Sequence, residues 1–208
     1  MRAVALGLAL LAGCTSPGIY YPKVHEQVIS LKKDDLAAHG IAFITPSTVT
    51  GQEQEKEAVA LTFADILKAE RPTLKVSTLA ETLGAVNKAG LAEEYRRMYE
   101  DYRDTGLFPA DALRGVAAAT GARYLAQLKL QGYSQGSKGR FGFLGLRIVE
   151  TQYADVRLFL QVWDGRDGSI AWEAMQELRI ARESMTEKPL MLRQMLEHSA
   201  RELIARLP

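Results

Sequence analysis

The second half of the chain alternates between apolar and polar side chains, and this pattern constrains the fold more than any other feature. Residues 124–131, 156–163 and 170–180 each repeat with a period of two, which is typical of strands with one buried face. Residues 164–168 read Asp-Gly-Arg-Asp-Gly and supply the turn chemistry that joins the last two strands as a hairpin. The segment therefore predicts three strands of a sheet.

The first half combines short strands with helices. Gly40 and Pro46 bound an apolar run that predicts a buried strand, and residues 74–78 predict another. Helices are expected from about residue 50 to the break at Pro72, over residues 80–88, 91–102 and 110–119, and from near Pro189 onward. The inner stripe of the first helix comprises Val59, Phe63, Ile66 and Leu67, and that of the last comprises Leu192, Leu196, Ala200, Leu203 and Leu207.

This order predicts an α/β protein with a small mixed sheet of about five strands, flanked by helices, in a single domain. The 208 residues carry 26 basic and 25 acidic side chains, so the chain has no broad positive field and nucleic acid is not expected as a partner. No apolar run approaches the roughly 20 residues of a membrane-spanning helix.

The N-terminus has the pattern of a lipoprotein signal. Arg2 precedes an apolar stretch over residues 3–10, and residues 11–14 read Leu-Ala-Gly-Cys, which closely resembles the bacterial lipobox. The resemblance implies a signal peptide over residues 1–13, cleavage between Gly13 and Cys14, and a lipid on Cys14. Thr15, which is not an aspartate, is by the same resemblance an outer-membrane address. The alternative is a buried apolar strand that ends in the chain's single cysteine.

Residues 14–38 are expected to form a lipidated tether in front of a domain at residues 39–208. Pro17, Gly18 and Pro22 interrupt regular structure. A flexible tether of about 25 residues spans roughly 25–30 Å on average and about 80 Å when stretched. The domain is therefore expected to stay near its membrane, on the periplasmic face of the outer membrane.

Three segments resemble recurring segments of one superfamily of bacterial envelope lipoproteins. They are residues 40–46, residues 121–125 (Gly-Ala-Arg-Tyr-Leu) and residues 160–172, which contain the hairpin turn. The superfamily includes the curli-secretion lipoprotein, the penicillin-binding-protein activators and the N-terminal domain of the Tol system's propeller protein. The resemblance covers most of the chain from residue 40 onward and implies a non-enzymatic domain that binds other envelope proteins.

Residues 131–147 are predicted to form a loop between two strands, with an apolar tip. Phe141, Phe143 and Leu144 lie beside glycines and basic residues, a composition that suits contact with lipid or with a partner. The alternative is a loop folded back onto its own sheet.

Tyr95, Tyr99 and Tyr102 form an aromatic stripe at helical spacing, between charged residues. Two interpretations remain open. The stripe packs onto the sheet, or it forms a partner-binding face, since tyrosine is enriched at interface hot spots.

Catalytic and metal-binding motifs are weak. Residues 132–136 match the G-x-S-x-G pattern around Ser134, but the glycine-rich sequence that follows does not predict the helix of a nucleophile elbow. His25, His39 and His198 lie far apart in the sequence and in no zinc motif. We therefore expect no enzymatic activity, no metal and no cofactor, with a serine hydrolase as the least favoured alternative.

The sequence thus predicts a non-catalytic, lipid-anchored binding or assembly module for envelope or secretion proteins, and it is compatible with oligomerisation. The main alternative is activation of a peptidoglycan synthase, a penicillin-binding protein. The tether argues against this alternative, because reaching an inner-membrane enzyme would require near-full extension.

Overall fold

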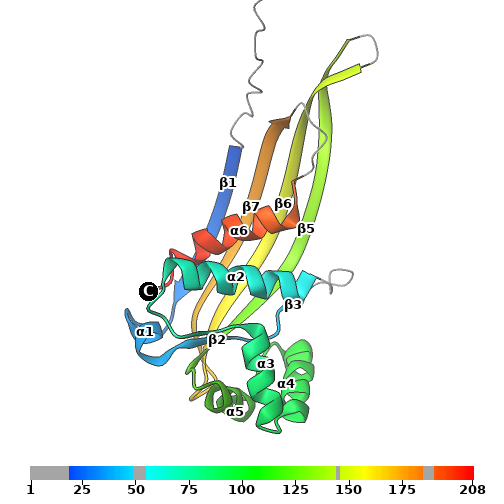
Figure 1. The fold of residues 1–208 in the computed structure, drawn as a ribbon. Helices are drawn as coiled ribbons and strands as arrows, with labels where there is room; N and C mark the ends of the chain where they lie inside the picture. The colour runs from blue at the N-terminus through cyan, green and yellow to red at the C-terminus, as the bar shows by residue number, and fades with distance from the viewer. Residues whose placement is uncertain (1–18, 49–54, 144–145, 185–189) are drawn as a thin grey trace, which may run out of the picture.

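The computed structural model describes residues 19–48, 55–143, 146–184 and 190–208, which form one mixed sheet flanked by helices (Figure 1). Within these ranges the sheet has seven strands. Six follow the order β1-β7-β6-β5-β2-β4, and β3 pairs with β5 outside this path. The predicted α/β class is confirmed, whereas the prediction of about five strands omitted β1 and β3.

Three long antiparallel strands form the centre of the sheet, and shorter parallel strands extend it. Their bounds are β5 (Tyr124–Phe143), β6 (Leu146–Asp164), β7 (Ile170–Ser184), β2 (Ile41–Phe43), β3 (Ser47–Thr48) and β4 (Val76–Ser77). β2 and β3 pair with β5, and β4 pairs with β2. The predicted hairpin turn joins β6 to β7, and Gly168 takes a φ of 78° there, which favours glycine.

The first strand, β1 (Ile19–Val28), corrects the prediction of a tether that extends to residue 38. It pairs antiparallel with β7 along its whole length. Pro22 fits because an edge strand leaves one side free of ladder hydrogen bonds. The prediction failed because this edge strand buries few apolar side chains. Tyr20, Tyr21 and Val28 are all exposed, so no clear apolar face marks the strand.

The predicted loop at residues 131–147 is wrong, because β5 and β6 continue through this segment as one long hairpin. The last described pair is Phe143 opposite Leu146, and Leu144 lies outside the described residues. The register shifts near Gly132 and Phe141 are bulge-like irregularities in the ladder. Glycine and lysine are depleted in strands, so the composition concealed the strand.

Helices α2 (Lys56–Glu70) and α6 (Leu192–Ile204) cover one face of the sheet (Figure 1). The stripes predicted from the sequence are the buried ones, except that Leu192 is only partly buried. Arg71, directly after α2, donates from its guanidinium to the carbonyl oxygens of Ile204 and Pro208, both at 3.1 Å. These bonds satisfy carbonyls at the end of α6 and tie the two helices together.

Helices α3 (Leu79–Lys88), α4 (Ala92–Thr105) and α5 (Ala110–Thr120) lie at the lower end of the molecule (Figure 1). They pack against the other face of the sheet through a second core, whose sheet residues Leu125 and Trp163 alternate with residues of the first core. A one-turn helix, α1 (Asp35–His39), follows β1. Within the described ranges, no helix has the length and hydropathy that crossing a bilayer requires.

A buried carboxylate stabilises the β6–β7 turn. Asp164 is 3% exposed and accepts hydrogen bonds from the guanidinium of Arg123 at 2.5 Å, and from the guanidinium and backbone N–H of Arg166 at 3.2 and 3.0 Å. Burial by itself would raise the pKa of Asp164, but the two arginines lower it to about 2. The turn is therefore held by an ion pair that needs the ionised carboxylate.

We predict that Arg123→Met destabilises the protein by about 3 kcal/mol or more at neutral pH, because it leaves a buried carboxylate without its main partner. Arg166→Met is the matched control. The side chain of Arg166 is 65% exposed, so its loss should cost less than about 1 kcal/mol. Urea unfolding of the two variants measures the difference.

The same ion pair predicts a pH dependence. Because the folded-state pKa of Asp164 lies below the ordinary value of 3.8, its stabilisation is present above about pH 4 and is lost as the pH falls through about 2. The gap in stability between the parent and Arg123→Met should therefore shrink over this range. A gap that stays constant with pH would contradict the role of the ion pair.

Candidate functional site

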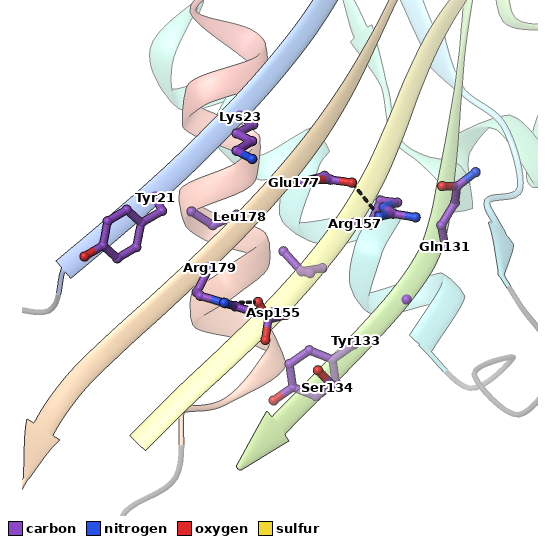
Figure 2. Close-up of a pocket in the computed structure, with 12 residues that line it drawn as sticks. Tyr21, Lys23, Gln131, Tyr133, Ser134, Asp155, Arg157, Glu177, Leu178 and Arg179 are labelled. Atoms are coloured by element: carbon purple, nitrogen blue, oxygen red, sulfur yellow. Dashed lines mark hydrogen bonds and ion pairs between the residues drawn. The ribbon is translucent and has the colours of Figure 1, made fainter. Parts of the chain in front are cut away.

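A groove of about 950 Å³ lies on the open face of the sheet, across β1, β7, β6 and β5 (Figure 2). Paired residues of antiparallel strands point to the same face, so the register arranges the side chains in rows across the strands. One row contains Tyr21, Arg179, Asp155 and Ser134, and the next contains Lys23, Glu177, Arg157 and Gly132.

Ion pairs between neighbouring strands organise the groove (Figure 2). Arg179 Nε donates to Asp155 Oδ1 at 2.6 Å, and Arg157 Nη2 lies 2.5 Å from Glu177 Oε1. The hydrogen bond and the charge of Asp155 raise the pKa of Arg179 above its ordinary value. These side chains are 31–63% exposed, so water screens their charges and each pair contributes little to stability.

The groove presents alternating charges rather than a field of one sign. Lys23 lies opposite Glu177 on the neighbouring strand, and Tyr21 is 57% exposed at the rim. Charged side chains on an open sheet also discourage aggregation between sheets. The surface can therefore bind a polar partner through hydrogen bonds and complementary charges, and it offers little to an apolar ligand.

Ser134 lies in this groove but not in a nucleophile elbow. Residues 132–136 run within β5, with Ser134 opposite Asp155, whereas the elbow is a sharp turn from a strand into a helix. His198 lies on α6, on the opposite face of the sheet, with its ring centroid 4.6 Å from that of Tyr20. The structure therefore does not bring Ser134 and His198 together.

The predicted tyrosine stripe lies between α4 and the sheet. Tyr95 is 9% exposed, and its hydroxyl accepts a hydrogen bond from the N–H of Thr45 at 2.9 Å. Tyr99 donates to the carbonyl oxygen of Thr45 at 2.8 Å, and burial raises the pKa of Tyr99 well above its ordinary value. Tyr102 stacks on Phe108 at a centroid distance of 4.2 Å. Tyr95 therefore packs in the core, as one of the two interpretations predicted. A partner contact through Tyr99 or Tyr102 stays a prediction.

Among the remaining predicted residues, the structure describes only Phe141 and Phe143, at the end of the sheet opposite α4. Gly13, Cys14 and Leu144 are outside the described residues. Phe141 and Phe143 belong to the last part of β5, at the tip of the hairpin. β1 begins at the same end of the sheet (Figure 1).

The charged groove was missed by the sequence analysis. Its side chains come from four strands, of which β1 was assigned to a tether and the far part of β5 to a loop. The sequence did contain one signal. Two charged residues of opposite sign, two positions apart, occur in each strand: Asp155 and Arg157 in β6, and Glu177 and Arg179 in β7. Only the strand register shows that they form two ion pairs.

No protein-family model matches the chain, and no curated protein matches it. The chain is distantly similar to solved bacterial structures. A PelC dodecamer from Paraburkholderia phytofirmans is 15% identical, with 90% of this chain and 94% of that chain covered and a TM-score of 0.45. Lipoprotein GNA1162 from Neisseria meningitidis is 16% identical, with 79% and 96% covered and a TM-score of 0.39.

A third solved structure is the LpoB C-terminal domain from Salmonella enterica. It is 13% identical, with 66% of this chain and 80% of that chain covered and a TM-score of 0.36. At such identities and TM-scores the likeness is too distant to carry an argument about function. Membership of the envelope-lipoprotein superfamily therefore stays a prediction from the sequence.

We predict that Arg179→Asp slightly lowers the urea midpoint of unfolding, because two like charges then face each other across β6 and β7. Adding Asp155→Arg restores an opposite-charge pair and should recover most of the loss. Urea unfolding midpoints of the parent, the single variant and the double variant measure this effect. A double variant less stable than the single variant would show that the two side chains do not act as a pair.

Proposed function

We propose that this protein is a lipid-anchored, non-catalytic binding and assembly module of the bacterial envelope. Cys14 holds it on the periplasmic face of the outer membrane, and the hairpin tip contacts the same membrane. Envelope or secretion proteins bind the charged groove on the open face of the sheet. The proposal rests on the lipobox pattern together with the geometry of the N-terminal end of the sheet.

One observation carries the proposal. β1 begins at Ile19, five residues after Cys14, so the link between lipid and sheet reaches at most about 18 Å. Ile19 lies in the same row as Ala181 and Tyr153, and Leu146 at the hairpin tip precedes Tyr153 by seven residues. At about 3.4 Å per residue, the tip extends about 24 Å beyond the start of β1. A domain that stands on this end therefore touches the membrane with its hairpin.

The composition of the tip supports contact with lipid. Phe141 and Phe143 are aromatic, and the sequence places Lys138, Arg140 and Arg147 near them. Aromatic side chains favour the membrane interface, and basic side chains attract anionic headgroups. The backbone here pairs with β6 up to Phe143, which disfavours the alternative of a loop folded back onto the sheet.

The short link also weighs against the activation of a peptidoglycan synthase in the inner membrane. A tether through residue 38 would reach about 80 Å when stretched, whereas the link to Ile19 reaches about 18 Å. The proposal therefore favours partners that lie close to the anchoring membrane.

The anchor is tested directly by Cys14→Ser. We predict that this change abolishes palmitate incorporation and releases the protein into the soluble periplasmic fraction, because the hairpin tip alone supplies only weak, reversible binding. Ser16→Ala, two residues away, is the matched control and should remain lipidated. Retention of the Cys14→Ser protein in membranes after a carbonate wash would contradict the lipoprotein assignment.

The hairpin tip is tested by replacing Phe141, Phe143 and Leu144 with Ser. We predict that the free energy of unfolding changes by no more than about 0.5 kcal/mol per residue, as is usual for exposed positions, while association with liposomes weakens. If these side chains were packed in the core, each Phe replacement would cost about 3 kcal/mol or more. Urea unfolding and liposome co-sedimentation distinguish the two outcomes.

Two exposed leucines at the far end of the molecule provide a matched control. Leu83 on α3 is 41% exposed and Leu107 after α4 is 63% exposed. Replacing both with Ser removes apolar surface of similar kind from the end opposite the hairpin. Liposome association should not change in this variant, and an equal loss in both variants would argue against contact at the tip.

A further inference from the structure

A second cavity, of about 640 Å³, lies between α4 and the sheet, away from the charged groove's ion pairs. Four parts of the chain meet around it. Ser47 comes from β3, Lys56 from the first turn of α2, Lys129 from β5, and Arg96, Tyr102 and Arg103 from α4. We refer to it below as the lysine cavity.

The lysine cavity differs from the charged groove because two of its lysines form no ion pair with the residues that the structure describes. Arg96 pairs with Glu93 and Glu100, and Arg103 pairs with Asp104. Among the described residues, no carboxylate forms an ion pair with Lys56 or Lys129. Lys129 is also half-buried. Because no carboxylate of the described residues pairs with these two lysines, the cavity is suited to an anion from outside the chain.

Ser47 occupies the position opposite Lys129 on the neighbouring strand. Ser47 and Lys129 are direct partners on parallel strands. The amide of Gln127, which is 1% exposed, donates from Nε2 to Ser47 Oγ at 2.9 Å. Because this bond uses an acceptor lone pair, the Ser47 hydroxyl keeps its own proton for donation. A buried amide thus orients a hydroxyl donor on the strand that pairs with Lys129.

An aromatic ring forms another part of the cavity lining. Tyr102 is partly buried and stacks on Phe108 with an interplanar angle of 12°, which fixes the plane of its ring. Ligand sites commonly combine such a rigid apolar wall with a few placed polar groups. The polar lining here includes two ammonium groups and a hydroxyl, which match a carboxylate and its neighbouring hydroxyl groups. The carboxylate of Glu100 also lines the cavity, and its charge is offset by its ion pair with Arg96.

We propose that the lysine cavity binds a sugar acid, with the carboxylate held by Lys129, Lys56 and the Ser47 hydroxyl, and the sugar ring against Tyr102. The inference goes beyond the proposed function and does not depend on the lipid at Cys14. Charge-assisted hydrogen bonds supply most of the affinity, because they are stronger than bonds between neutral groups.

In the orientation given under the proposed function, with the hairpin tip on the membrane, the cavity lies far from the headgroups of that membrane. Lys129 pairs with Phe159, which lies thirteen residues along β6 from Leu146 at the hairpin tip. At about 3.4 Å per residue the cavity is roughly 44 Å from the tip, far beyond a phospholipid phosphate. The ligand therefore comes from the aqueous side of the membrane.

The test is calorimetric titration of the full chain in detergent micelles with trigalacturonate. We expect a Kd of about 1 mM or tighter. Lys129→Gln should weaken binding about tenfold or more, which is the effect of losing one charge-assisted bond. Ser47→Ala should weaken it severalfold, and this variant keeps the proposal testable if Lys129→Gln does not fold. Lys88→Gln, an exposed lysine on α3, should leave binding unchanged.

Two further titrants test which chemical groups of the ligand are needed for binding. Maltotriose, which has no carboxylate, should not bind detectably. Inorganic phosphate should bind at least tenfold more weakly than trigalacturonate. The proposal is overturned if trigalacturonate does not bind, if maltotriose or phosphate binds equally well, or if Lys129→Gln and Lys88→Gln have the same affinity. Loss of lipidation in Cys14→Ser should not alter any of these results.

Discussion

The pairing of β1 with β7 is the interaction that determines where the N-terminal segment joins the sheet. It fixes the residue at which the sheet begins and therefore the greatest distance at which any lipid on Cys14 can lie from the sheet. Side chains reinforce the edge strand. Val24 packs against the main core, the ring of Tyr20 contacts His198, and Glu26 forms an ion pair with Arg206 at 3.4 Å. Without this strand the domain would hang on a long tether with no defined orientation.

The antiparallel register then separates the molecule into zones along its strands. The hairpin tip lies at one end, the charged groove lies on the open face in the middle, and α3 to α5 lie at the other end (Figure 1). The lysine cavity lies where the open face meets α4. The two hydrophobic cores hold this arrangement, because α2 and α6 pack on one face while α3 to α5 cover only part of the other.

Helices and strands could be predicted from the sequence where their buried side chains recur with a regular period. The stripe of α2, with Val59 and Phe63, and the alternation along β7, with Trp172 and Ala174, correctly predicted both elements and their buried faces. The sequence was insufficient where a strand buries little or is rich in glycine, as in β1 and the far part of β5. The groove and the lysine cavity could not be predicted, because pairs such as Ser47 and Lys129 meet only through strand register, 82 residues apart in sequence.

Site-directed spin labelling in bilayers tests the orientation of the domain most directly. Cys14 is the only cysteine and its thiol is blocked in the lipidated protein, so a single introduced cysteine can be labelled selectively. One label is placed in the hairpin by Gly142→Cys and the other at the far end by Lys88→Cys. We predict that the label at position 142 is more accessible to oxygen in the lipid than to a water-soluble nickel chelate, with the reverse at position 88. Equal, water-exposed accessibility at both positions would contradict it.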